Sequence, residues 1–424
     1  MSTTTLLAAW VSTVLAAQIG PTDLTGDTQV LTRFSPVYGA DYEPKSEYDG
    51  VGFQMLKEVP TGDDISRLAA ELNVDELETR LDKLPASSSL ELSPWPGSYW
   101  PTARDGINVR WNGAELSPAE KYAIAFGLDI NTFLEGISKK NGVLSKSGNK
   151  ACTTDEDCKS VGEGVACGIR QGEPSGRCIP LWFGICHAWA PAALLEPEPK
   201  CPVTINNVTF DRVDIKALIT QTYDGAELPM FFGGNRYHGP SQIAMEDGRP
   251  SDPKYRDLNP GFLHIAMANM LGIHKRGFII DKSADNEVWN QPVRRYNVLQ
   301  KAPITSEQAG ALLNKPKYPY NDHAAQLVHV KTQFDWIKEA FEDVAYVETG
   351  KVDNEMEGEE YEYILELDDA GKIVGGEWIN AAITKHPDFL WFPTKRPAQD
   401  LVTDVNLSIA NVRQLLLKSL ASTC

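Results

Sequence analysis

The stretch Trp182-Phe-Gly-Ile-Cys-His-Ala-Trp189 places a thiol after a glycine turn and between aromatic residues. Its cysteine, Cys186, is one of seven in the chain. The other six can form three disulfides: Cys152, Cys158, Cys167, Cys178, Cys201 and Cys424. An odd cysteine in a secreted protein indicates a reactive thiol or an intermolecular bridge. The setting favours a reactive thiol, and the alternatives are a buried, inert cysteine and one paired with Cys201.

Residues 1–17 are expected to form a secretory signal peptide. An apolar run from Thr5 to Ala17 ends in small residues, which suits cleavage after Ala16 or Ala17. The run is shorter than the roughly 20 apolar residues that span a bilayer, although no Lys or Arg precedes it. A buried N-terminal helix is the alternative. We therefore expect a secreted protein, located outside the cell or in the cell wall.

The composition predicts a folded, acidic protein. Its 424 residues are 42% apolar and carry a net charge of −18. That charge opposes binding to nucleic acid or to anionic lipid, and no later segment approaches transmembrane length. Clustered carboxylates can also hold calcium. The segment Asp353-x-Glu355-x-Glu357-Gly358 begins like a calcium loop, but Ile364 stands where such a loop needs Glu, so we interpret it as a solvated acidic turn.

Two triplets, Asn207-Val-Thr209 and Asn406-Leu-Ser408, are acceptor sites for N-glycosylation if the chain passes through a eukaryotic secretory route. A glycoprotein is expected in that case.

Residues 18–92 are interpreted as an N-terminal extension or propeptide. Gly62-Asp-Asp-Ile-Ser66 opens a helical pattern, and Ala86-Ser-Ser-Ser89 is typical of a linker. The main domain is expected over residues 93–400, followed by a C-terminal helix or tail over 401–424. Within it, Trp95-Pro-Gly-Ser-Tyr-Trp-Pro101 predicts an ordered loop, and Ser117-Pro-Ala-Glu120 is a capping box that starts a helix.

Residues 150–180 are predicted to form a small disulfide-rich insert. Four cysteines with the spacing Cys152-x5-Cys158-x8-Cys167-x10-Cys178 enclose polar and Gly-rich sequence with few core-forming side chains. Two disulfides would stabilise such a segment, and their connectivity is open among three arrangements. Zinc binding is the competing interpretation, although no Cys-x2-Cys pair or nearby His supports it.

The C-terminal half is typical of an α+β protein. Tyr361–Leu367 and Lys372–Trp378 flank the turn Asp368-Asp-Ala-Gly371, which predicts a β-hairpin. Leu327 to Val347 carries a helical pattern.

A nucleophilic cysteine must become a thiolate, and it therefore needs a base, a cation or a helix N-terminus nearby. Gly184 supplies a tight turn before Cys186, and the apolar segment Ala188–Leu195 is expected to form the helix. Pro191 predicts that this helix is kinked or begins late.

The base must come from elsewhere, because His187 adjoins the thiol and neighbours usually point apart. The remaining histidines are His238, His264, His274, His323, His329 and His386. His264 follows a polar turn, and Asp281 ends the apolar strand candidate Gly277–Asp281. A buried carboxylate there needs a partner, and 17 residues of separation allow Asp281 to orient the His264 imidazole. Phosphate-loop, zinc-protease and serine-elbow motifs are not found in the sequence.

The segment Glu287-Val-Trp-Asn-Gln-Pro-Val-Arg294 closely resembles the elicitor segment of the oomycete secreted transglutaminases, which are calcium-dependent enzymes that plant immune systems recognise. The resemblance is strong over Val288, Trp289, Asn290, Gln291, Pro292, Val293 and Arg294, and it weakens afterwards. Further motifs resemble the same family: Trp95–Pro101, Ser117–Tyr122, Cys186–Pro191, Asn259–His264 and His386–Trp391. The resemblance runs from about Trp95 to Pro393. It implies a cysteine-protease-like core of the papain/transglutaminase type, a catalytic domain over 93–400 and a need for calcium, whose ligands it does not identify.

The resemblance also implies an acyl-transfer mechanism. The Cys186 thiolate would attack a protein-bound glutamine, His264 would protonate the departing ammonia, and a lysine amine would resolve the thioester into an isopeptide crosslink. Asp281 would orient the imidazole, with Asn290 and His274 as an alternative pair. The backbone amide of Cys186 would contribute to the oxyanion hole, and Trp182 or Trp189 would shield the thioester from water.

The expected partners are proteins with accessible Gln and Lys side chains, and a plant immune receptor. Two other functions remain open: a secreted cysteine peptidase or deamidase of the same fold, and a non-catalytic cell-wall or host-interaction protein.

Overall fold

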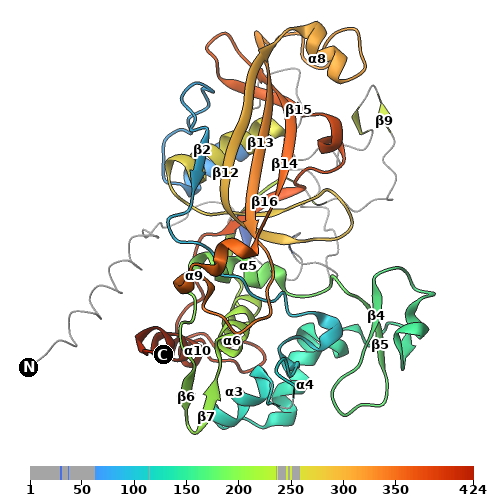
Figure 1. The fold of residues 1–424 in the computed structure, drawn as a ribbon, viewed down its shortest axis with the longest axis vertical. Coiled ribbons are helices and arrows are strands. Elements are labelled where there is room, and N and C mark those ends of the chain that lie inside the picture. The colour runs from blue at the N-terminus through green and yellow to red at the C-terminus, as the bar shows by residue number, and fades with distance from the viewer. Residues whose placement is uncertain are drawn as a thin grey trace, which may run out of the picture.

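The computed structural model describes residues 29–30, 37, 63–113, 115–234, 236, 245–246, 249–250 and 258–424. The predicted signal peptide, residues 1–17, lies outside the described residues. The described chain mixes helices with a large antiparallel sheet. Its long strands gather at one end of the molecule and several helices at the other, with helix α5 between them (Figure 1).

The main sheet has nine strands in the order β1-β8-β16-β11-β12-β13-β14-β15, and β2 pairs with β12 outside this path. Every pairing within it is antiparallel. The strands are β1 (Gln29–Val30), β2 (Ser87–Ser89), β8 (Pro229–Gly234), β11 (Ile279–Asp281), β12 (Asn290–Ile304), β13 (Gln326–Ile337), β14 (Met356–Leu367), β15 (Ile373–Trp378) and β16 (Phe389–Pro393).

Three smaller sheets, nine α-helices and six short 3₁₀ helices complete the described elements, together with one π-helical turn. The small strands are β3 (Ala151–Cys152), β4 (Val165–Gly168), β5 (Gly176–Pro180), β6 (Val203–Ile205), β7 (Val208–Phe210), β9 (Met245–Glu246) and β10 (Arg249–Pro250). The helices are α2 (Asp63–Glu71), α3 (Pro118–Phe126), α4 (Ile130–Asn141), α5 (Cys186–Leu195), α6 (Arg212–Asp224), α7 (Pro260–Met267), α8 (Ser306–Leu312), α9 (Tyr346–Thr349) and α10 (Ile409–Ala421). A π-helical turn, η6 (Ala268–Ile273), continues α7.

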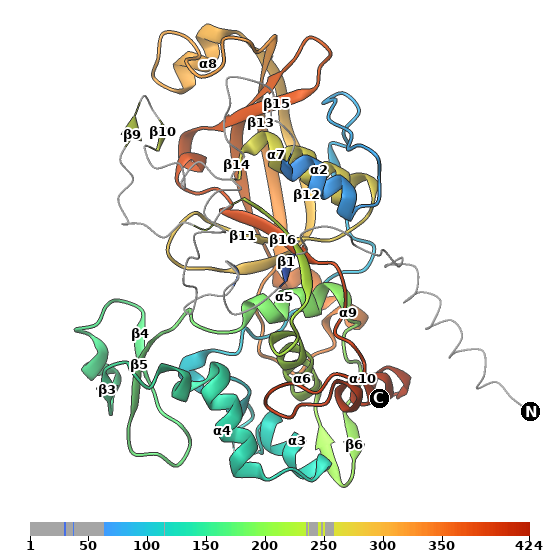
Figure 2. The same cartoon turned by 180° about the vertical axis from the view of Figure 1, so that it is seen from behind.

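Two hydrophobic cores lie on opposite faces of the central strands. On β11 the side chain of Ile279 enters the core that also contains Cys186 and Trp189, whereas Ile280 enters the core that contains Leu263 and Phe262 of α7. Alternate residues of a strand point to opposite faces, which explains the division. Helix α7 lies against the strands at the far end from α6 and α10 (Figure 2). The sheet therefore separates α5 from α7.

Several local predictions are confirmed. The hairpin is β14–β15. Helix α3 begins with the predicted capping box, since Ser117 accepts a bond from Glu120 N and the Glu120 carboxylate accepts one from Ser117 N. Two predictions are wrong: Ala86–Ser89 is not a linker but supplies β2, which pairs with β12, and the helical pattern that begins at Leu327 is occupied largely by strand β13.

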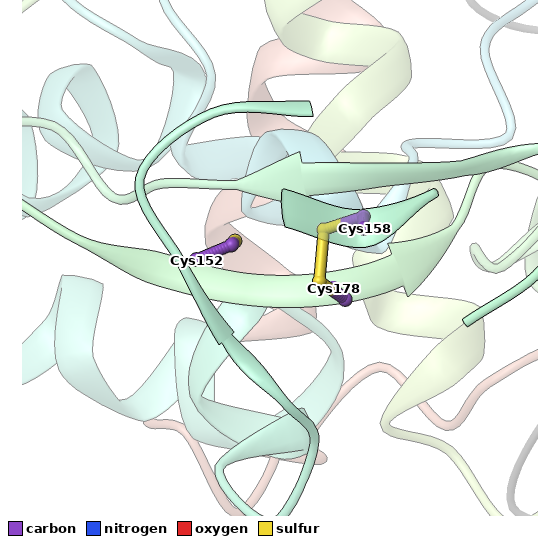
Figure 3. Close-up of side chains that lie close together, drawn as sticks. All are labelled: Cys152, Cys158 and Cys178. Carbon is purple, nitrogen blue, oxygen red and sulfur yellow. A yellow bond between two sulfur atoms is a disulfide. The ribbon is translucent and has the colours of Figure 1, made fainter. Parts of the chain in front are cut away.

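All six predicted cysteines form disulfides: Cys152–Cys167, Cys158–Cys178 and Cys201–Cys424. The sulfurs of Cys152, Cys158 and Cys178 lie within 4.8 Å of one another, and Figure 3 shows the bond between the last two. Because each of these sulfurs is already bonded to another sulfur, the arrangement favours disulfides over the zinc interpretation. Cys186 is free and buried.

Within the described ranges, no helix has the length and apolar character needed to cross a membrane.

Candidate active site

Cys186 is the first residue of α5, and the preceding loop fixes its position. Ile185 N donates to Tyr99 O at 2.7 Å, and Thr102 N donates to Phe183 O at 2.8 Å. A Cβ atom on Gly184 would lie only 2.5 Å from the Tyr99 carbonyl oxygen, so glycine is required by this close approach. The predicted aromatic loop, residues 95–101, therefore holds the turn that starts α5.

Helix α5 is a buried element that packs against α6 and β12. It continues through Pro191 to Leu195, so the expectation of a late start is wrong. Its N-cap residue, Ile185, has no side-chain capping bond. The first backbone amides of a helix lack intrahelical acceptors and favour negative charge nearby. This geometry suits a thiolate or an oxyanion at Cys186.

The Cys186 thiol is enclosed by the segment around Asn290. The Asn290 side-chain amide donates from Nδ2 to Sγ at 3.4 Å, and the thiol donates to Val288 O at 3.6 Å. Asn290 Oδ1 accepts a bond of 2.7 Å from Trp391 Nε1, which fixes the orientation of the amide. Asn290 Nδ2 also donates to Val37 O at 3.0 Å. Thus one buried amide links the thiol, β16 and the N-terminal region.

The segment Val288–Arg294 lies against this site. Its buried members are Val288, Asn290, Gln291, Pro292 and Val293, whereas Trp289 and Arg294 are half-buried. The ring of Trp289 lies 5.3 Å from that of Tyr99, in an edge-to-face arrangement. Sequence reasoning treated this segment mainly as a recognition motif. The structure places it directly against Cys186.

Asp281 lies on the same face of the sheet as the thiol. It pairs with Asn290 across β11 and β12, and residues directly opposite in an antiparallel pair share a face. Oδ1 accepts from Trp289 N at 2.9 Å, and among the described residues Oδ2 has no hydrogen-bond partner. Burial raises the pKa of this carboxyl to about 8, so it is largely protonated at neutral pH.

The thiol itself is protonated in this arrangement. Burial raises the pKa of Cys186 to about 11, and the nearby charge of Glu339 acts in the same direction. The hydrogen bonds from Asn290 oppose this shift. Glu339 accepts a bond of 2.9 Å from Gln291 Nε2, and burial raises its pKa as well.

His264 and Cys186 are not brought together. His264 lies on α7, where its Nδ1 meets the Tyr363 hydroxyl at 2.8 Å, on the opposite face of the sheet from α5. Burial lowers its pKa to about 3. Asp281 is likewise directed to Trp289 rather than to His264. Of the predicted Cys186–His264–Asp281 constellation, Cys186 and Asp281 lie on one face of the sheet and His264 lies on the other.

Three other histidines have side-chain partners elsewhere. His187 Nε2 meets Asp224 Oδ1 at 3.1 Å, His329 Nε2 meets Glu362 Oε1 at 2.6 Å, and His386 Nδ1 bonds to Ala382 O. His274 caps η6 at the end of α7 and is not brought to Asn290. Of the histidines that the structure describes, none is in hydrogen-bond contact with the Cys186 thiol. His238 lies outside the described residues.

The two tryptophans proposed as shields lie in different settings. Trp189 is fully buried in the core beneath α5, and Trp182 is half-buried with its ring 4.5 Å from that of Phe183.

The acidic turn that resembles a calcium loop does not present free carboxylates. Asp353 pairs with Arg294 at 3.0 Å, and Lys338 lies 3.9 Å from Glu355 and 3.7 Å from Glu357. Among the described residues, one group of metal-ligating side chains lies close enough together to hold an ion. It consists of Cys152, Cys158 and Cys178, which are already in disulfides. These residues do not fit a calcium site.

A free thiol at a helix N-terminus, lined by an amide and a buried carboxyl, defines a candidate thiol-dependent acyl-transfer site. A family model described as transglutaminase elicitor matches residues 64–424. The chain therefore belongs to the transglutaminase elicitor family. It is also similar to the crystal structure of the GP42 transglutaminase from Phytophthora sojae, with 46% identity and a TM-score of 0.78 over 86% of this chain and 100% of that chain. No curated protein is significantly similar to it.

Proposed function

We propose that this protein is a secreted transglutaminase that crosslinks glutamine and lysine side chains of proteins through a Cys186 thioester. One observation carries the proposal: the single free cysteine begins α5 and contacts the segment Val288–Asn290, in a chain that belongs to the transglutaminase elicitor family. A papain-like arrangement of helix and strands around the thiol is part of this proposal.

In the proposed reaction, Sγ of Cys186 attacks the carboxamide carbon of a substrate glutamine. The C–N bond breaks, ammonia leaves and a thioester forms. A lysine amine then attacks the thioester carbon, the C–S bond breaks, and an isopeptide bond remains. The backbone amide of Cys186 stabilises the oxyanion in both steps, because the amides in the first turn of α5 have no acceptors within the helix.

We assign proton transfer to Asp281 in place of His264. In its ionised form, Asp281 takes the thiol proton as the thiol attacks and gives it to the leaving amide nitrogen. It then takes a proton from the lysine amine and returns it to the sulfur. A general acid–base works best when its pKa lies near the operating pH, and the pKa of Asp281 is raised to about 8. Among the described residues its second oxygen has no hydrogen-bond partner, and this oxygen would bond a substrate atom.

The extracellular setting and recognition by plants belong to the same proposal. Three disulfides fit an oxidising compartment. An immune receptor that binds the intact protein would contact Trp289 and Arg294, since the other five residues of the segment are buried. Calcium dependence is proposed from the family resemblance alone, because the described residues supply no ligand set.

Incorporation of dansylcadaverine into casein tests the proposal. The wild-type chain is expected to label casein, Cys186→Ala to lose all labelling, and EDTA to abolish labelling until calcium is restored. Cleavage of casein without labelling would identify a peptidase instead, and release of ammonia without labelling would identify a deamidase. A chain with none of these activities would be a non-catalytic interaction protein.

Two matched variants test the proton carrier. Asp281→Asn is expected to lower the labelling rate by at least ~100-fold, in the range of general acid–base catalysis. Asp369→Asn, on the exposed turn between β14 and β15, is the control and retains the rate. His264→Gln is expected to retain activity in the folded fraction. Full activity of Asp281→Asn together with loss in His238→Ala would reassign the role to His238.

A further inference from the structure

The Asn290 side-chain amide presents a hydrogen-bond donor to the sulfur of Cys186. Its nitrogen, Nδ2, lies 3.4 Å from Sγ and 3.0 Å from Val37 O, so each of its two hydrogens has an acceptor. The thiol hydrogen is directed elsewhere, to Val288 O at 3.6 Å. The sulfur therefore accepts a bond from Asn290 while it donates one to the backbone.

The indole of Trp391 determines which end of the amide faces the sulfur. The oxygen and nitrogen of an Asn side chain have nearly the same shape, so the hydrogen-bond partners decide which end lies where. An indole N–H can only donate, and Trp391 Nε1 meets the amide at 2.7 Å, which requires Oδ1 at that end. Both side chains are fully buried. Nδ2 is therefore held toward Sγ by partners inside the protein.

The side-chain donors on either side of Asn290 in the sequence are bonded to other acceptors. Trp289 Nε1 donates to Glu287 Oε2 at 2.9 Å, and Gln291 Nε2 donates to Glu339 Oε1 at 2.9 Å. Among the described residues, the side-chain N–H group that meets the Cys186 sulfur thus belongs to Asn290.

Acyl transfer needs a donor at this place because negative charge develops beside the sulfur. When Sγ bonds to the carboxamide carbon, the π pair of the C=O bond moves to the oxygen, which becomes an oxyanion two bonds from Sγ. Fixed N–H donors aimed at such an oxygen are usually the largest single contribution to catalysis. The first turn of α5 supplies one backbone donor, and Asn290 at the start of β12 supplies a side-chain donor. Asp281 lies directly opposite Asn290 on the same face of the sheet.

We propose that Asn290 is a catalytic residue whose Nδ2 hydrogen turns from Sγ to the oxyanion and, together with the backbone amide of Cys186, completes a two-donor oxyanion hole. The hydrogen returns to the sulfur when the C=O bond re-forms and the leaving group departs. The inference rests on the proposed function, because it gives Asn290 a role in that acyl transfer. The role is distinct from holding the thiol, since the amide acts on the carbonyl oxygen.

Two reactions of the same thiol test the proposal. Acylation of Cys186 by p-nitrophenyl acetate passes through a tetrahedral oxyanion, whereas alkylation by iodoacetamide is a direct displacement that forms none. Cys186 is the cysteine outside the disulfides, so peptide mass spectrometry identifies both products. Asn290→Ala is expected to lower the acylation rate about 100-fold to 1000-fold and to change the alkylation rate only a few-fold, through loss of the bond to sulfur. Asn297→Ala, at an exposed asparagine of β12, is the control and retains both rates.

The double variant Asn290→Ala/Trp391→Phe covers the case in which the single variant does not fold, because it leaves no indole N–H unpaired. The same excess loss of acylation over alkylation is expected in it. Equal fold-changes in the two reactions would overturn the proposal, because they would show that Asn290 acts only through the thiol, and an unchanged acylation rate would also overturn it. Acylation that depends on Asn290, in a wild-type protein that does not label casein with dansylcadaverine, would support the oxyanion hole and refute the transglutaminase function instead.

Discussion

Replacing Trp391 by Phe tests whether β16 orients the amide that touches the thiol. The Trp391 indole N–H donates a 2.7 Å bond to Asn290 Oδ1, and both side chains are fully buried. Phenylalanine retains an aromatic ring but removes the donor, so Oδ1 is left without this partner. The amide then loses the contact that directs Nδ2 toward Cys186 and Val37.

The magnitude follows from the burial of both groups. An unpaired buried acceptor costs about 1–3 kcal/mol, and the smaller ring adds about 1 kcal/mol of lost packing, so Trp391→Phe is expected to lower the free energy of unfolding by about 2–4 kcal/mol. Asn290→Ala leaves the indole N–H unpaired and is expected to cost a similar amount. The double variant removes both the indole N–H and the amide oxygen, so neither is left buried without its partner. Its cost is expected to fall short of the sum by about 1–2 kcal/mol.

Urea unfolding of the wild type, the two single variants and the double variant measures this coupling energy. Far-ultraviolet circular dichroism is the readout, because it does not depend on tryptophan fluorescence. Dansylcadaverine labelling of the same proteins is expected to fall in Trp391→Phe even under conditions where the protein is fully folded. Costs that add to within about 0.5 kcal/mol would refute the argument, because they would show that the two side chains do not depend on each other. An unchanged labelling rate in folded Trp391→Phe would show that catalysis does not depend on the orientation of the Asn290 amide.

Three further predictions concern charge. Lys216→Met is expected to lower the free energy of unfolding in urea by about 3–5 kcal/mol, because it leaves the buried Glu198 carboxylate, 2.6 Å from Nζ, without its charged partner; the two side chains are 3% and 4% exposed. The double variant Lys216→Met/Glu198→Leu should recover part of this loss. An unchanged urea midpoint of the single variant would contradict the prediction. Alkylation of Cys186 in the wild-type chain is expected to rise about tenfold per pH unit from pH 7 to 10, since its pKa is raised to about 11, and a plateau near pH 8 would be the contrary result. The pKa of Asp281 is raised from 3.8 to about 8, so between these pH values the folded chain binds one more proton than the unfolded chain, and the free energy of unfolding falls as the pH rises. Asp281→Asn should reduce this dependence of the urea midpoint on pH, measured at pH 5, 7 and 9. An equal pH dependence in both proteins would refute the raised pKa of Asp281.

Local sequence signals predicted those parts of the fold that depend on neighbouring residues. The capping box at Ser117–Glu120 and the hairpin turn at Asp368–Gly371 are set within a few residues, and both are found where expected. The segment Leu327–Ile337 was ambiguous for a physical reason. Leu327, Val330, Phe334 and Ile337 fit a helical repeat, while Val328, Val330, Phe334 and Trp336 fit a strand. Pairing with β12 and β14 selects the strand.

The thiol and its wall were predictable only in part. Counting cysteines singled out Cys186, and the glycine turn before it proved to be required by Tyr99 O. The position of His264 could not be derived, because two elements 17 residues apart can lie on either face of a sheet. Whether a side chain faces Cys186 depends on its position along the strand, because successive residues point to opposite faces of the sheet. On β11, Ile279 faces the core that contains Cys186, and Ile280 faces the core on the other side.

Strand register also explains why Asp281 and Asn290 belong together. They are separated by a loop in the sequence, yet they lie directly opposite each other on β11 and β12, on the face that carries Cys186. A shift of one residue in this pairing would place the two side chains on opposite faces of the sheet. Asn290 is the first residue of β12, and Gln291 and Pro292 pair with β11 while Asn290 contacts the thiol. Under the proposed function, a substitution that alters this segment would therefore also alter the surroundings of Cys186.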